Sequence, residues 1–398
     1  MATAVLDVEF ENLPTEIKVS EKYSRALVLV RYKGYPVSQC LIPVVEGRVG
    51  GENILEAILT SVNGIFWEHW LQNYLQLEET NALLRTQLKA TIAVCTRDRT
   101  EYLKRCLESL MNLHDDGQEY LVIDNCPTND STRAMVQKFD RIRYIHETRP
   151  GLNIARNRAL REAHNDIVAF TDDDAEVDPN WLRALLNNFD DPTVMCVTGL
   201  TMPKELEDVS QEWFEQMSPF QRGFRRVVIE WSNLNPLHSF HVGSGVNMAL
   251  RRNVLEKIGF FDESLDTGTQ TLSGGDTDLF SRILAGGYRI VYDPRALNWH
   301  LHRNSWNTLR KTLFGYGVGV SAALTRRFVV DGECDVPNLY LRILWGKLRN
   351  FVSSILNKDE HSPGDLKLAE IAGFLIGPLA YCYSRIKLKT RIDRSNDR

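Results

Sequence analysis

The chain has 398 residues, of which 43% are hydrophobic and 25% are charged, with a formal net charge of −5. This length exceeds one ordinary domain, and the composition is that of a soluble globular protein. The seven cysteines are scattered and include no Cys-x-x-Cys pair, so neither a zinc ribbon nor a disulfide framework is expected, and a reducing cytosol fits best. No stretch has the pattern of a secretory signal, so secretion is not expected.

The charge is unevenly distributed along the chain. Residues 303–398 carry 16 Lys and Arg against 9 Asp and Glu, a net charge of +7, which leaves −12 for residues 1–302. A basic region of this kind suits either a nucleic acid or an anionic membrane surface.

Residues 1–85 are expected to form a small α+β accessory domain. The alternation of apolar residues predicts strands, and the helical spacing that follows predicts two helices. The segments are strands at 25–32 and 37–43 around a hairpin-like turn at 33–36, and helices at 52–62 and 67–84. No catalytic grouping occurs there, so we expect a structural or acceptor-docking role.

From Lys89 onward, strand, turn and helix repeat, which predicts a parallel sheet with right-handed crossovers. The predicted strands are 91–95, 121–123, 142–145 and 167–170, and the helices are 101–113, one capped by Asp130 or Ser131, and 152–163. Polar residues follow the successive strands, namely Thr96, Asp124, Arg149 to Arg156, and then Asp172 and Asp174. Ligands of open α/β sheets bind at such strand ends.

Three consecutive carboxylates, Asp172, Asp173 and Asp174, end the fourth strand. Three like charges held together are costly unless a cation neutralises them, and Mg²⁺ or Mn²⁺ is the natural partner for oxygen ligands. If the extended geometry continues, Asp172 and Asp174 share one face and Asp173 points away. The alternative is a solvated acidic turn that caps the helix after Pro179.

This arrangement of strand ends suits a nucleotide, since carboxylates accept from a base or ribose and arginine meets phosphate. Other phosphate-binding fingerprints are missing. There is no Walker lysine loop, and Gly243-Ser244-Gly245 lacks a third glycine at Met248, as Gly315-Tyr316-Gly317 does at Val320. A P-loop NTPase and a dinucleotide dehydrogenase are therefore disfavoured, and a metal must carry most of the phosphate charge.

Residues 201–242 are predicted to be irregular, and their aromatic side chains either contact a sugar ring or pack the loop onto the domain. These aromatics are Trp213, Phe214, Phe220, Phe224 and Trp231. A strand is expected at 246–250. Asp276 lies just before the helical run 279–284, at the start of a predicted helix. A carboxylate is a favoured capping residue at a helix start.

Alternation in the segment from Trp299 to His302 places both imidazoles, His300 and His302, on one face. They are either metal or diphosphate ligands or a structural pair.

The last part, 306–398, has a helical texture. Its uncharged stretch at 371–384 has 14 residues, short of the ~20 that span a bilayer. Cations follow it at Arg385, Lys387, Lys389 and Arg391. This predicts an interfacial helix on an anionic leaflet, a helix packed on the core, or an oligomer contact.

Six motifs occur in the order typical of family 2 glycosyltransferases, which the chain resembles over 91–302. They are Ala93-Val94-Cys95-Thr96-Arg97-Asp98-Arg99, Val122-Ile123-Asp124-Asn125, Arg149-Pro150-Gly151-Leu152-Asn153-Ile154-Ala155-Arg156-Asn157, Thr171-Asp172-Asp173-Asp174, Gly243-Ser244-Gly245-Val246-Asn247-Met248-Ala249 and Gly274-Gly275-Asp276-Thr277-Asp278-Leu279. The resemblance implies a GT-A fold, an NDP-sugar donor, a divalent metal and inversion at the anomeric carbon.

The resemblance also implies a role for each matched residue. Seven residues would bind the nucleotide-sugar: Thr96, Asp124 at the base, Asp172 at the ribose, Asp173, Asn247, Arg149 and Arg156. Either of the two arginines could instead be an ordinary surface or helix-end residue. Asp174 would bind the metal, together with one of His300 and His302. Asp276 matches the general base, and Asp278 and Trp231 are candidates for the acceptor side.

The fold class expected is therefore α/β, a GT-A (Rossmann-like) nucleotide-diphospho-sugar transferase core at 89–302, with the accessory domain at 1–85 and a basic helical region at 303–398. The expected activity is inverting, Mn²⁺- or Mg²⁺-dependent transfer from an NDP-sugar, with a UDP-sugar favoured, to a glycan or lipid-linked acceptor. We expect a cytoplasmic protein, peripheral at the inner face of the plasma membrane, with no nucleic-acid partner. A sugar-phosphate nucleotidyltransferase and a silent glycan-binding module are the alternatives.

Overall fold

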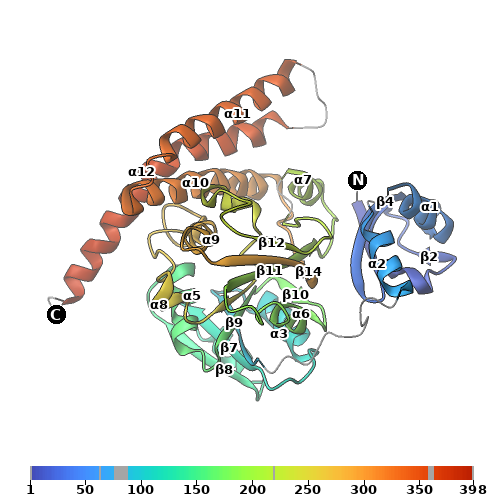
Figure 1. The fold of residues 1–398 in the computed structure, drawn as a ribbon, viewed down its shortest axis with the longest axis horizontal. Helices are drawn as coiled ribbons and strands as arrows, with labels where there is room; N and C mark the ends of the chain where they lie inside the picture. The colour runs from blue at the N-terminus through green and yellow to red at the C-terminus, as the bar shows by residue number, and fades with distance from the viewer. Residues whose placement is uncertain (1, 62–63, 76–87, 218–219, 357–362, 397–398) are drawn as a thin grey trace.

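The computed structural model describes residues 2–61, 64–75, 88–217, 220–356 and 363–396. It contains a small N-terminal α/β module, a large mixed sheet covered by helices, and three long C-terminal helices (Figure 1). In Figure 1 the N-terminal module lies on one side of the large sheet, and the C-terminal helices lie over its upper edge and project beyond it.

The N-terminal module contains a three-stranded sheet in the order β1-β3-β4, a short β2–β5 pair and two helices. The elements are β1 Ala2–Glu9, β2 Glu16–Lys18, β3 Tyr23–Tyr32, β4 Tyr35–Pro43, β5 Arg48–Gly50, α1 Gly51–Ser61 and α2 Ile65–Tyr74. The predicted hairpin is present, and its turn residues Lys33 and Gly34 both have positive φ, as a tight type I′ turn requires. Strand β1, parallel to β3, was not predicted. The predicted helical segment beyond Tyr74 lies largely outside the described residues.

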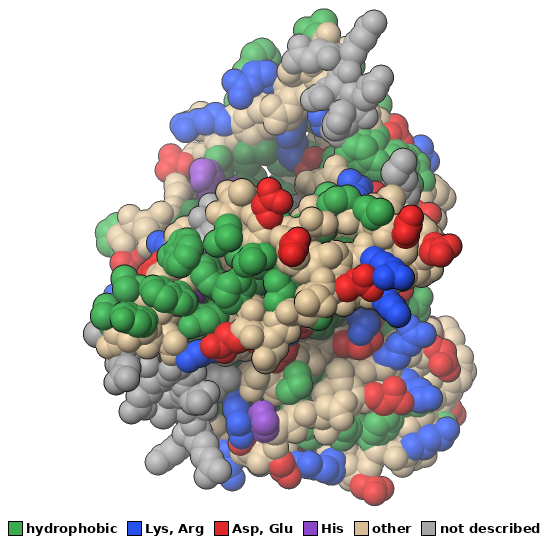
Figure 2. Space-filling model, turned by 90° about the vertical axis from the view of Figure 1, so that its right-hand side faces the viewer, with side chains coloured by type: hydrophobic (Ala, Val, Ile, Leu, Met, Phe, Trp, Pro, Cys, Tyr) green, Lys and Arg blue, Asp and Glu red, His purple; other side chains and the backbone are tan. Residues whose placement is uncertain are grey.

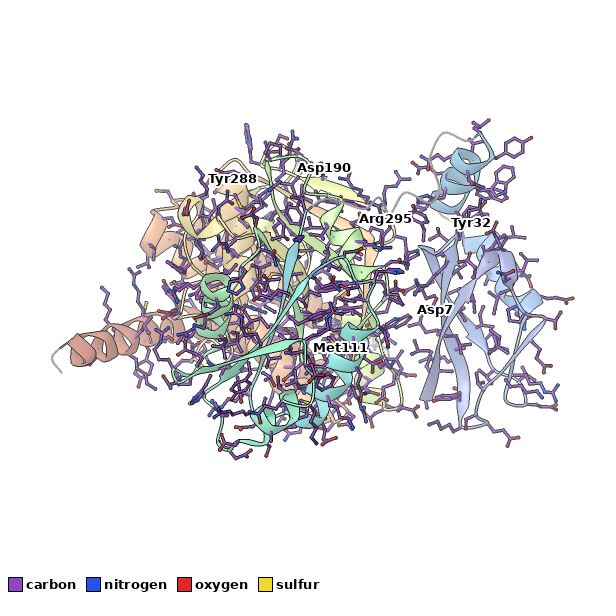
Figure 3. The ribbon with its side chains drawn as sticks, turned by 90° about the horizontal axis from the view of Figure 1, so that it is seen from below. Asp7, Tyr32, Met111, Asp190, Tyr288 and Arg295 are labelled. Atoms are coloured by element: carbon purple, nitrogen blue, oxygen red, sulfur yellow. The ribbon has the colours of Figure 1, made fainter. Side chains whose placement is uncertain are left out.

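The module packs on the large sheet through one face of β3. Leu27 and Leu29 join a buried cluster with Leu200, Met202 and Leu297. At the same boundary Arg295 lies with its guanidinium 5.8 Å from the centroid of the Tyr35 ring, and Figure 3 shows Arg295 between the module and the core. The two units therefore share an apolar contact with charged residues at its edge.

The large sheet has nine strands, ordered β10-β14-β11-β13-β9-β6-β7-β8, with β12 paired to β14. The strands are β6 Ala90–Thr96, β7 Glu119–Asn125, β8 Ile142–Glu147, β9 Ile167–Asp172, β10 Ala175–Val177, β11 Val194–Pro203, β12 Val227–Ile229, β13 Asn247–Arg251 and β14 Arg289–His300. Strands β8, β7, β6 and β9 are parallel, so the repeating pattern predicted their direction correctly. As a result, Thr96 lies opposite Asp124 and Cys95 opposite Asp172 at one edge of the sheet.

Helices cover both faces of this sheet, and the region 201–242 is more ordered than predicted. The helices are α3 Thr100–Met111, α4 Ser131–Val136, α5 Leu152–Glu162, α6 Trp181–Leu186, α7 Val209–Met217, α8 Val254–Lys257 and α9 Gly275–Ala285, with 3-10 turns η1 Phe10–Asn12 and η2 Pro236–His241. The irregular loop was a wrong prediction because β11 continues to Pro203 and α7 follows. Phe214 of α7 is buried against Leu309 and Leu313, a contact that local sequence does not reveal.

The C-terminal helices are α10 Trp306–Asp331, α11 Val336–Leu356 and α12 Gly364–Asn396. Helices α10 and α12 touch backbone to backbone where they cross. A Cβ at Gly373 would lie 2.0 Å from the Phe314 carbonyl oxygen, and one at Gly317 would lie 2.1 Å from the Glu370 oxygen. Only glycine permits this approach. Helix α12 is therefore fixed to α10 along one of its faces.

By length and composition alone, one helix among the described residues, at Gly364–Thr390, could cross a membrane, and 39% of its apolar window is buried in the protein. It contains the uncharged stretch at 371–384 that the sequence predicts to be interfacial, packed on the core or an oligomer contact. Its buried face is the face that packs on α10.

The glycine crossing predicts a specific loss of stability. We expect Gly373→Ala to lower the free energy of unfolding by about 1–3 kcal/mol, because the new methyl group overlaps the Phe314 carbonyl. Gly346→Ala, in α11, is the matched control. A Cβ at that position would point into open space, so the substitution should stabilise α11 by up to about 1 kcal/mol. Urea unfolding of both variants measures the difference, and equal midpoints would contradict the close crossing.

Candidate functional site

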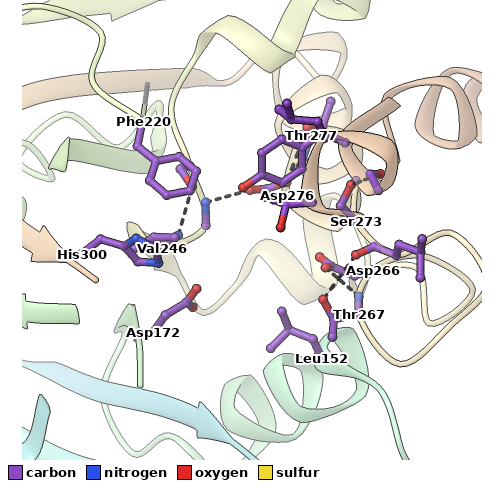
Figure 4. Close-up of a pocket in the computed structure, with 18 of the residues that line it drawn as sticks. Leu152, Asp172, Phe220, Val246, Asp266, Thr267, Ser273, Asp276, Thr277 and His300 are labelled. Carbon is purple, nitrogen blue, oxygen red and sulfur yellow. Dashed lines mark hydrogen bonds between the residues drawn. The ribbon is translucent and has the colours of Figure 1, made fainter. Parts of the chain in front are cut away.

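A cleft of about 1320 Å³ lies at the carboxyl ends of β6 and β9, bounded by the starts of α9 and α10. Its lining includes Thr96, Arg156, Asp172, Asp174, Asp276 and His300. Figure 4 shows Asp172 and His300 on one side of this cleft and Asp276 on the other. The edge of the sheet where the sequence predicted ligands therefore opens into this cleft.

The three acids do not share one extended strand. Strand β9 ends at Asp172, and Asp173 and Asp174 form a turn before β10. Arg99 donates to both of them, from Nη1 to Asp173 Oδ1 at 2.6 Å and from Nη2 to Asp174 Oδ2 at 2.7 Å. Thr96 Oγ1 also donates to Asp173 Oδ2 at 2.7 Å. The alternation assumed for Asp172 and Asp174 therefore stops at Asp172, two residues before Asp174, and Asp173 is held by neighbouring strand-end residues.

Burial and charge set different protonation preferences on these acids. Burial raises the pKa of Asp172 to about 6 and that of Asp173 to about 7, although Arg156 and Arg99 lower them in part. Burial acts in the same direction on Asp174, but the charge and hydrogen bond of His300, with Arg99, outweigh it and hold the pKa of Asp174 well below its usual range. Asp174 is therefore the carboxylate that stays ionised.

His300 and His302 lie on one face of their segment, as alternation predicted, and continue a chain of polar contacts. His300 Nε2 lies 3.2 Å from Asp174 Oδ1, and His300 Nδ1 lies 3.0 Å from His302 Nδ1. His302 Nε2 lies 3.1 Å from Glu215 Oε2, and burial raises the pKa of Glu215 to about 8. His300 is therefore the imidazole adjacent to the acids, and His302 is one contact further away.

The donor set fits a divalent cation that is shared with a substrate. Asp174 and His300 offer an oxygen and a nitrogen 3.2 Å apart in the cleft. Nowhere in the described ranges do three or more His, Cys, Asp or Glu residues form a group that could hold a metal by itself. Mg²⁺ and similar ions are commonly held by one or two protein carboxylates, with phosphate oxygens and waters completing the shell.

Asp276 faces this group from the start of α9. Its Oδ2 accepts from the Gly245 amide at 2.7 Å, the contact drawn in Figure 4, and its Oδ1 accepts from the Thr277 amide at 2.7 Å. The N-cap of α9 is Gly274, with φ of 100° and no side-chain cap. Asp276 is therefore not the N-cap residue: one of its oxygens accepts from an amide of the first turn, and the other is bonded to a separate loop.

A buried ion pair, Arg156 with Asp266, lies at the wall of the cleft. Arg156 is buried, and its Nη1 lies 3.1 Å from Asp266 Oδ2. Asp172 and Asp276 also act electrostatically on this guanidinium. Arg156 is therefore a counter-charge for the acids of the cleft, and its pairing with Asp266 gives it one hydrogen-bonded partner that the sequence did not identify.

Asp124 is the second-last residue of β7, beside Thr96, and it is fully buried behind the cleft lining, which its neighbour Asn125 joins. Its Oδ2 accepts from the Tyr144 hydroxyl at 2.8 Å, whereas its Oδ1 has no hydrogen-bond partner in the part of the chain that is described. Burial raises the pKa of this carboxyl. An unsatisfied buried acceptor at a strand end is costly unless a ligand supplies a donor.

Besides Asp124, two further predicted nucleotide-sugar residues, Asn247 and Arg149, lie outside the cleft lining. Asn247 is 0% exposed, and its side chain accepts from Trp181 Nε1 at 2.8 Å and donates to the Leu200 and Ala296 carbonyls. It ties strands together, and its full burial leaves it no surface for a ligand. Arg149 is half exposed and pairs with Glu263 at 3.0 Å. Both assignments are corrected on these contacts.

The acceptor-side candidates Asp278 and Trp231 are corrected as well. Asp278 is fully buried and pairs with Arg282 at 2.8 Å and Arg326 at 3.3 Å, so it holds α9 to α10. Trp231 is 68% exposed in a turn and does not line the cleft. Sequence reasoning missed Arg99, Asp266 and Glu215, because their partners come from distant segments. Only Arg99 carried a signal, its place in the motif after the first strand.

Comparison with known proteins identifies related sequences and the fold. Residues 91–259 match the family model described as Glycosyl transferase family 2. The chain is 28% identical over 234 residues to a pre-mycofactocin glycosyltransferase of Mycobacterium tuberculosis, which covers 56% of this chain and 46% of that protein. It is 22% identical over 285 residues to a glucosyl-dolichyl phosphate glucuronosyltransferase of Haloferax volcanii, which covers 67% of this chain and 87% of that protein.

Among solved structures, a mannosyltransferase from Pyrobaculum calidifontis in complex with GDP-Man and Mn²⁺ resembles the chain with a TM-score of 0.52 at 16% identity. That likeness covers 73% of this chain and 87% of the other. The predicted GT-A fold with a helical C-terminal region is confirmed. The chain spans about half the length of the first of these relatives, 46%.

Arg99 generates a prediction about charge balance. Arg99→Met leaves Asp173 and Asp174 without their shared cation, and breaking a buried pair costs about 3–5 kcal/mol. We expect the free energy of unfolding to fall by an amount near the lower end of this range, because Arg99 is partly exposed. Added Mn²⁺ should raise the melting temperature of this variant more than that of the parent.

The matched control is Arg48→Met, which removes an exposed pair with Glu16 worth less than about 1 kcal/mol. Differential scanning fluorimetry with and without Mn²⁺ compares the two variants. Equal losses in both, or no response of Arg99→Met to Mn²⁺, would contradict the assigned charge balance.

Proposed function

We propose that the chain is an inverting, metal-dependent family 2 glycosyltransferase that moves a sugar from an NDP-sugar to an acceptor hydroxyl. The observation that carries the proposal is one cleft with Asp174 and His300 on one side and Asp276 on the other. The family match over 91–259 supports it. A glycan or lipid-linked acceptor, in the synthesis of a polysaccharide, glycolipid or cell-surface glycan, belongs to the same proposal.

The donor nucleotide would lie along the ends of β6, β7 and β9. Asp124 is buried next to Thr96 and Asn125, which line the cleft, and its Oδ1 atom has no partner among the described residues. This atom would accept from the imide N–H of uracil, so a UDP-sugar is the donor that we propose. Thr96 and Asp172 would contact the nucleoside, with Asp172 at the ribose. Arg156 would stabilise Asp172 from behind, since its charge lowers the pKa of that carboxyl.

Asp174 and His300 would hold the divalent cation, which, when bound, neutralises the charge that develops on the leaving diphosphate. His302 and Glu215 would fix the orientation of the His300 ring through the Nδ1 contact, since a metal-binding histidine is oriented by the partner of its other ring nitrogen. Arg303 Nη2 lies 3.4 Å from Asp174 Oδ2 and adds a further positive charge beside the diphosphate position.

Transfer would be a single displacement. The acceptor oxygen forms a bond to the anomeric carbon while the bond from that carbon to the diphosphate oxygen breaks, and its electron pair leaves with the NDP. Asp276 takes the proton of the acceptor hydroxyl. The amides of Gly245 and Thr277 hold the Asp276 carboxylate in place, which supports a base with a fixed orientation.

Asp276→Asn separates a base from a structural role. The amide side chain keeps the size of the aspartate but accepts no proton, and its NH2 group gives up one of the two hydrogen bonds accepted from the Gly245 and Thr277 amides. We therefore expect a slightly lower melting temperature and an unchanged donor affinity. The rate of Mn²⁺-dependent hydrolysis of the donor should fall about 10²–10⁴-fold. Asp278→Asn is the control for a structural role, because weakening its buried ion pairs with Arg282 and Arg326 should lower the melting temperature. Full turnover by Asp276→Asn would move the base elsewhere.

Asp174→Ala tests the proposed metal position. Calorimetry should show that this variant binds UDP no more tightly with Mn²⁺ than without it, while the parent gains affinity from the ion. Glu176→Ala, which removes an exposed partner of Lys204, should behave as the parent does. Metal-dependent UDP affinity that survives in Asp174→Ala is the result that would refute the assignment.

A further inference from the structure

The cleft extends away from the sheet and reaches the C-terminal helices. Beyond Asp276 its lining continues through Thr308, Lys311, Thr312, Ile343, Lys347 and Glu370, which belong to α10, α11 and α12. An acceptor that reaches Asp276 from this end would pass between helices rather than along the sheet.

The outer face of α11 is an exposed apolar stripe, made of Leu341, Trp345, Leu348, Val352 and Ile355. These residues are spaced by four and three positions, which places them on one side of the helix. Trp345 is 69% exposed. Arg342 and Arg349, both exposed, lie at one border of the stripe. An apolar face bordered by cations is the pattern of a helix that lies in a membrane interface.

Helix α12 has the same two features on its free face. Leu375, Leu379 and Ile386 are exposed, and Leu379 is 75% exposed. The exposed Lys387 and Lys389 follow at the end of the stripe. The opposite face, with Gly373 and Gly377, is packed against α10. Because that face is occupied by protein, α12 offers the bilayer one side only, which is interfacial docking and not a free span.

We propose that α11 and α12 dock on an anionic lipid bilayer, and that the acceptor is carried in that bilayer and enters the cleft between α10 and α11. The net charge of +7 over residues 303–398, against −12 for the remainder, orients this end of the protein toward anionic lipid. The identity of the acceptor as a bilayer-borne molecule rests on the proposed transferase function, whereas the docking does not.

A second exposed apolar patch supplies a matched control. Figure 2 shows hydrophobic side chains gathered over the N-terminal module, where Trp67, Trp70 and Tyr74 of α2 are exposed. Trp67 is 47% exposed, so it offers a comparable tryptophan on another surface. Of these two tryptophans, Trp345 is the one on a helix that lines the cleft and carries two exposed arginines beside its stripe.

The test is flotation of the full-length protein with vesicles of phosphatidylcholine alone or of equal parts phosphatidylcholine and phosphatidylglycerol. We expect binding to the anionic vesicles at low salt. The double variant Arg342→Gln with Arg349→Gln should weaken it, by about fivefold for each arginine. Trp345→Ser with Leu348→Ser should weaken it about tenfold, given the apolar area that each side chain would bury.

The controls are Trp67→Ser, and Lys104→Gln with Arg105→Gln on the exposed side of α3, and both should leave vesicle binding unchanged. Absence of binding to anionic vesicles overturns the proposal. The proposal is also overturned if Trp67→Ser abolishes vesicle binding while the double variant Trp345→Ser with Leu348→Ser leaves it intact. Concentration-dependent dimers that the Trp345 variant dissolves, without vesicle binding, would make the stripe a contact between two copies.

The outcome is separable from that of the transferase proposal. Vesicle binding without any binding of UDP or NDP-sugars would leave the docking intact and refute the function. Mn²⁺-dependent donor hydrolysis without vesicle binding would support the function and refute the docking.

Discussion

The neutralisation of three consecutive carboxylates at the end of a buried strand is the constraint on which the site depends. Asp172, Asp173 and Asp174 could not all remain ionised together in a low-dielectric environment without nearby cations. Arg99 bridges two of them, Arg156 acts on the third, and His300 contacts Asp174. These partners come from the first strand-end loop, from α5 and from β14, so the acids draw three distant segments to one edge of the sheet.

The repeating strand and helix pattern was sufficient to predict the parallel part of the fold. Thr96, Asp124 and Asp172 lie at the ends of β6, β7 and β9, as the sequence indicated, because parallel neighbours end at the same edge. The antiparallel insertion of β13 between β9 and β11 was not predictable, since its direction depends on pairing between segments far apart in the chain.

Side-chain roles were harder to predict than strand positions. Asn247 and Asp278 lie in motifs that suggest ligand contact, yet each is saturated by partners that only the folded chain supplies. The Trp181 indole satisfies Asn247, and Arg326, 48 positions later, pairs with Asp278. Asp276, two residues before Asp278, faces the cleft, because the first turn of α9 presents these positions in different directions. Arg149, Trp231 and Asp124 also lie outside the cleft lining, whereas Thr96, Arg156, Asp172, Asp173, Asp174 and His300 line it.

Close glycine contacts connect the C-terminal helices to the start of α9. A Cβ at Gly274, next to Gly275 and Asp276, would lie 2.5 Å from the Gly319 carbonyl oxygen of α10, and α10 meets α12 at Gly373. Packing of this kind allows little relative movement. A surface that positions α11 and α12 would therefore also position the cleft and Asp276.

The central claim is that this cleft transfers a sugar from an NDP-sugar with inversion. Its most direct test is incubation of the purified protein with a panel of NDP-sugars and Mn²⁺, with nucleotide products separated by chromatography and the released sugar followed by proton NMR. We expect slow release of a nucleoside diphosphate from at least one donor, loss of that activity on chelation, and a first-formed sugar of inverted anomeric configuration. Release of a nucleoside monophosphate, or a first-formed sugar with retained configuration, would contradict the claim.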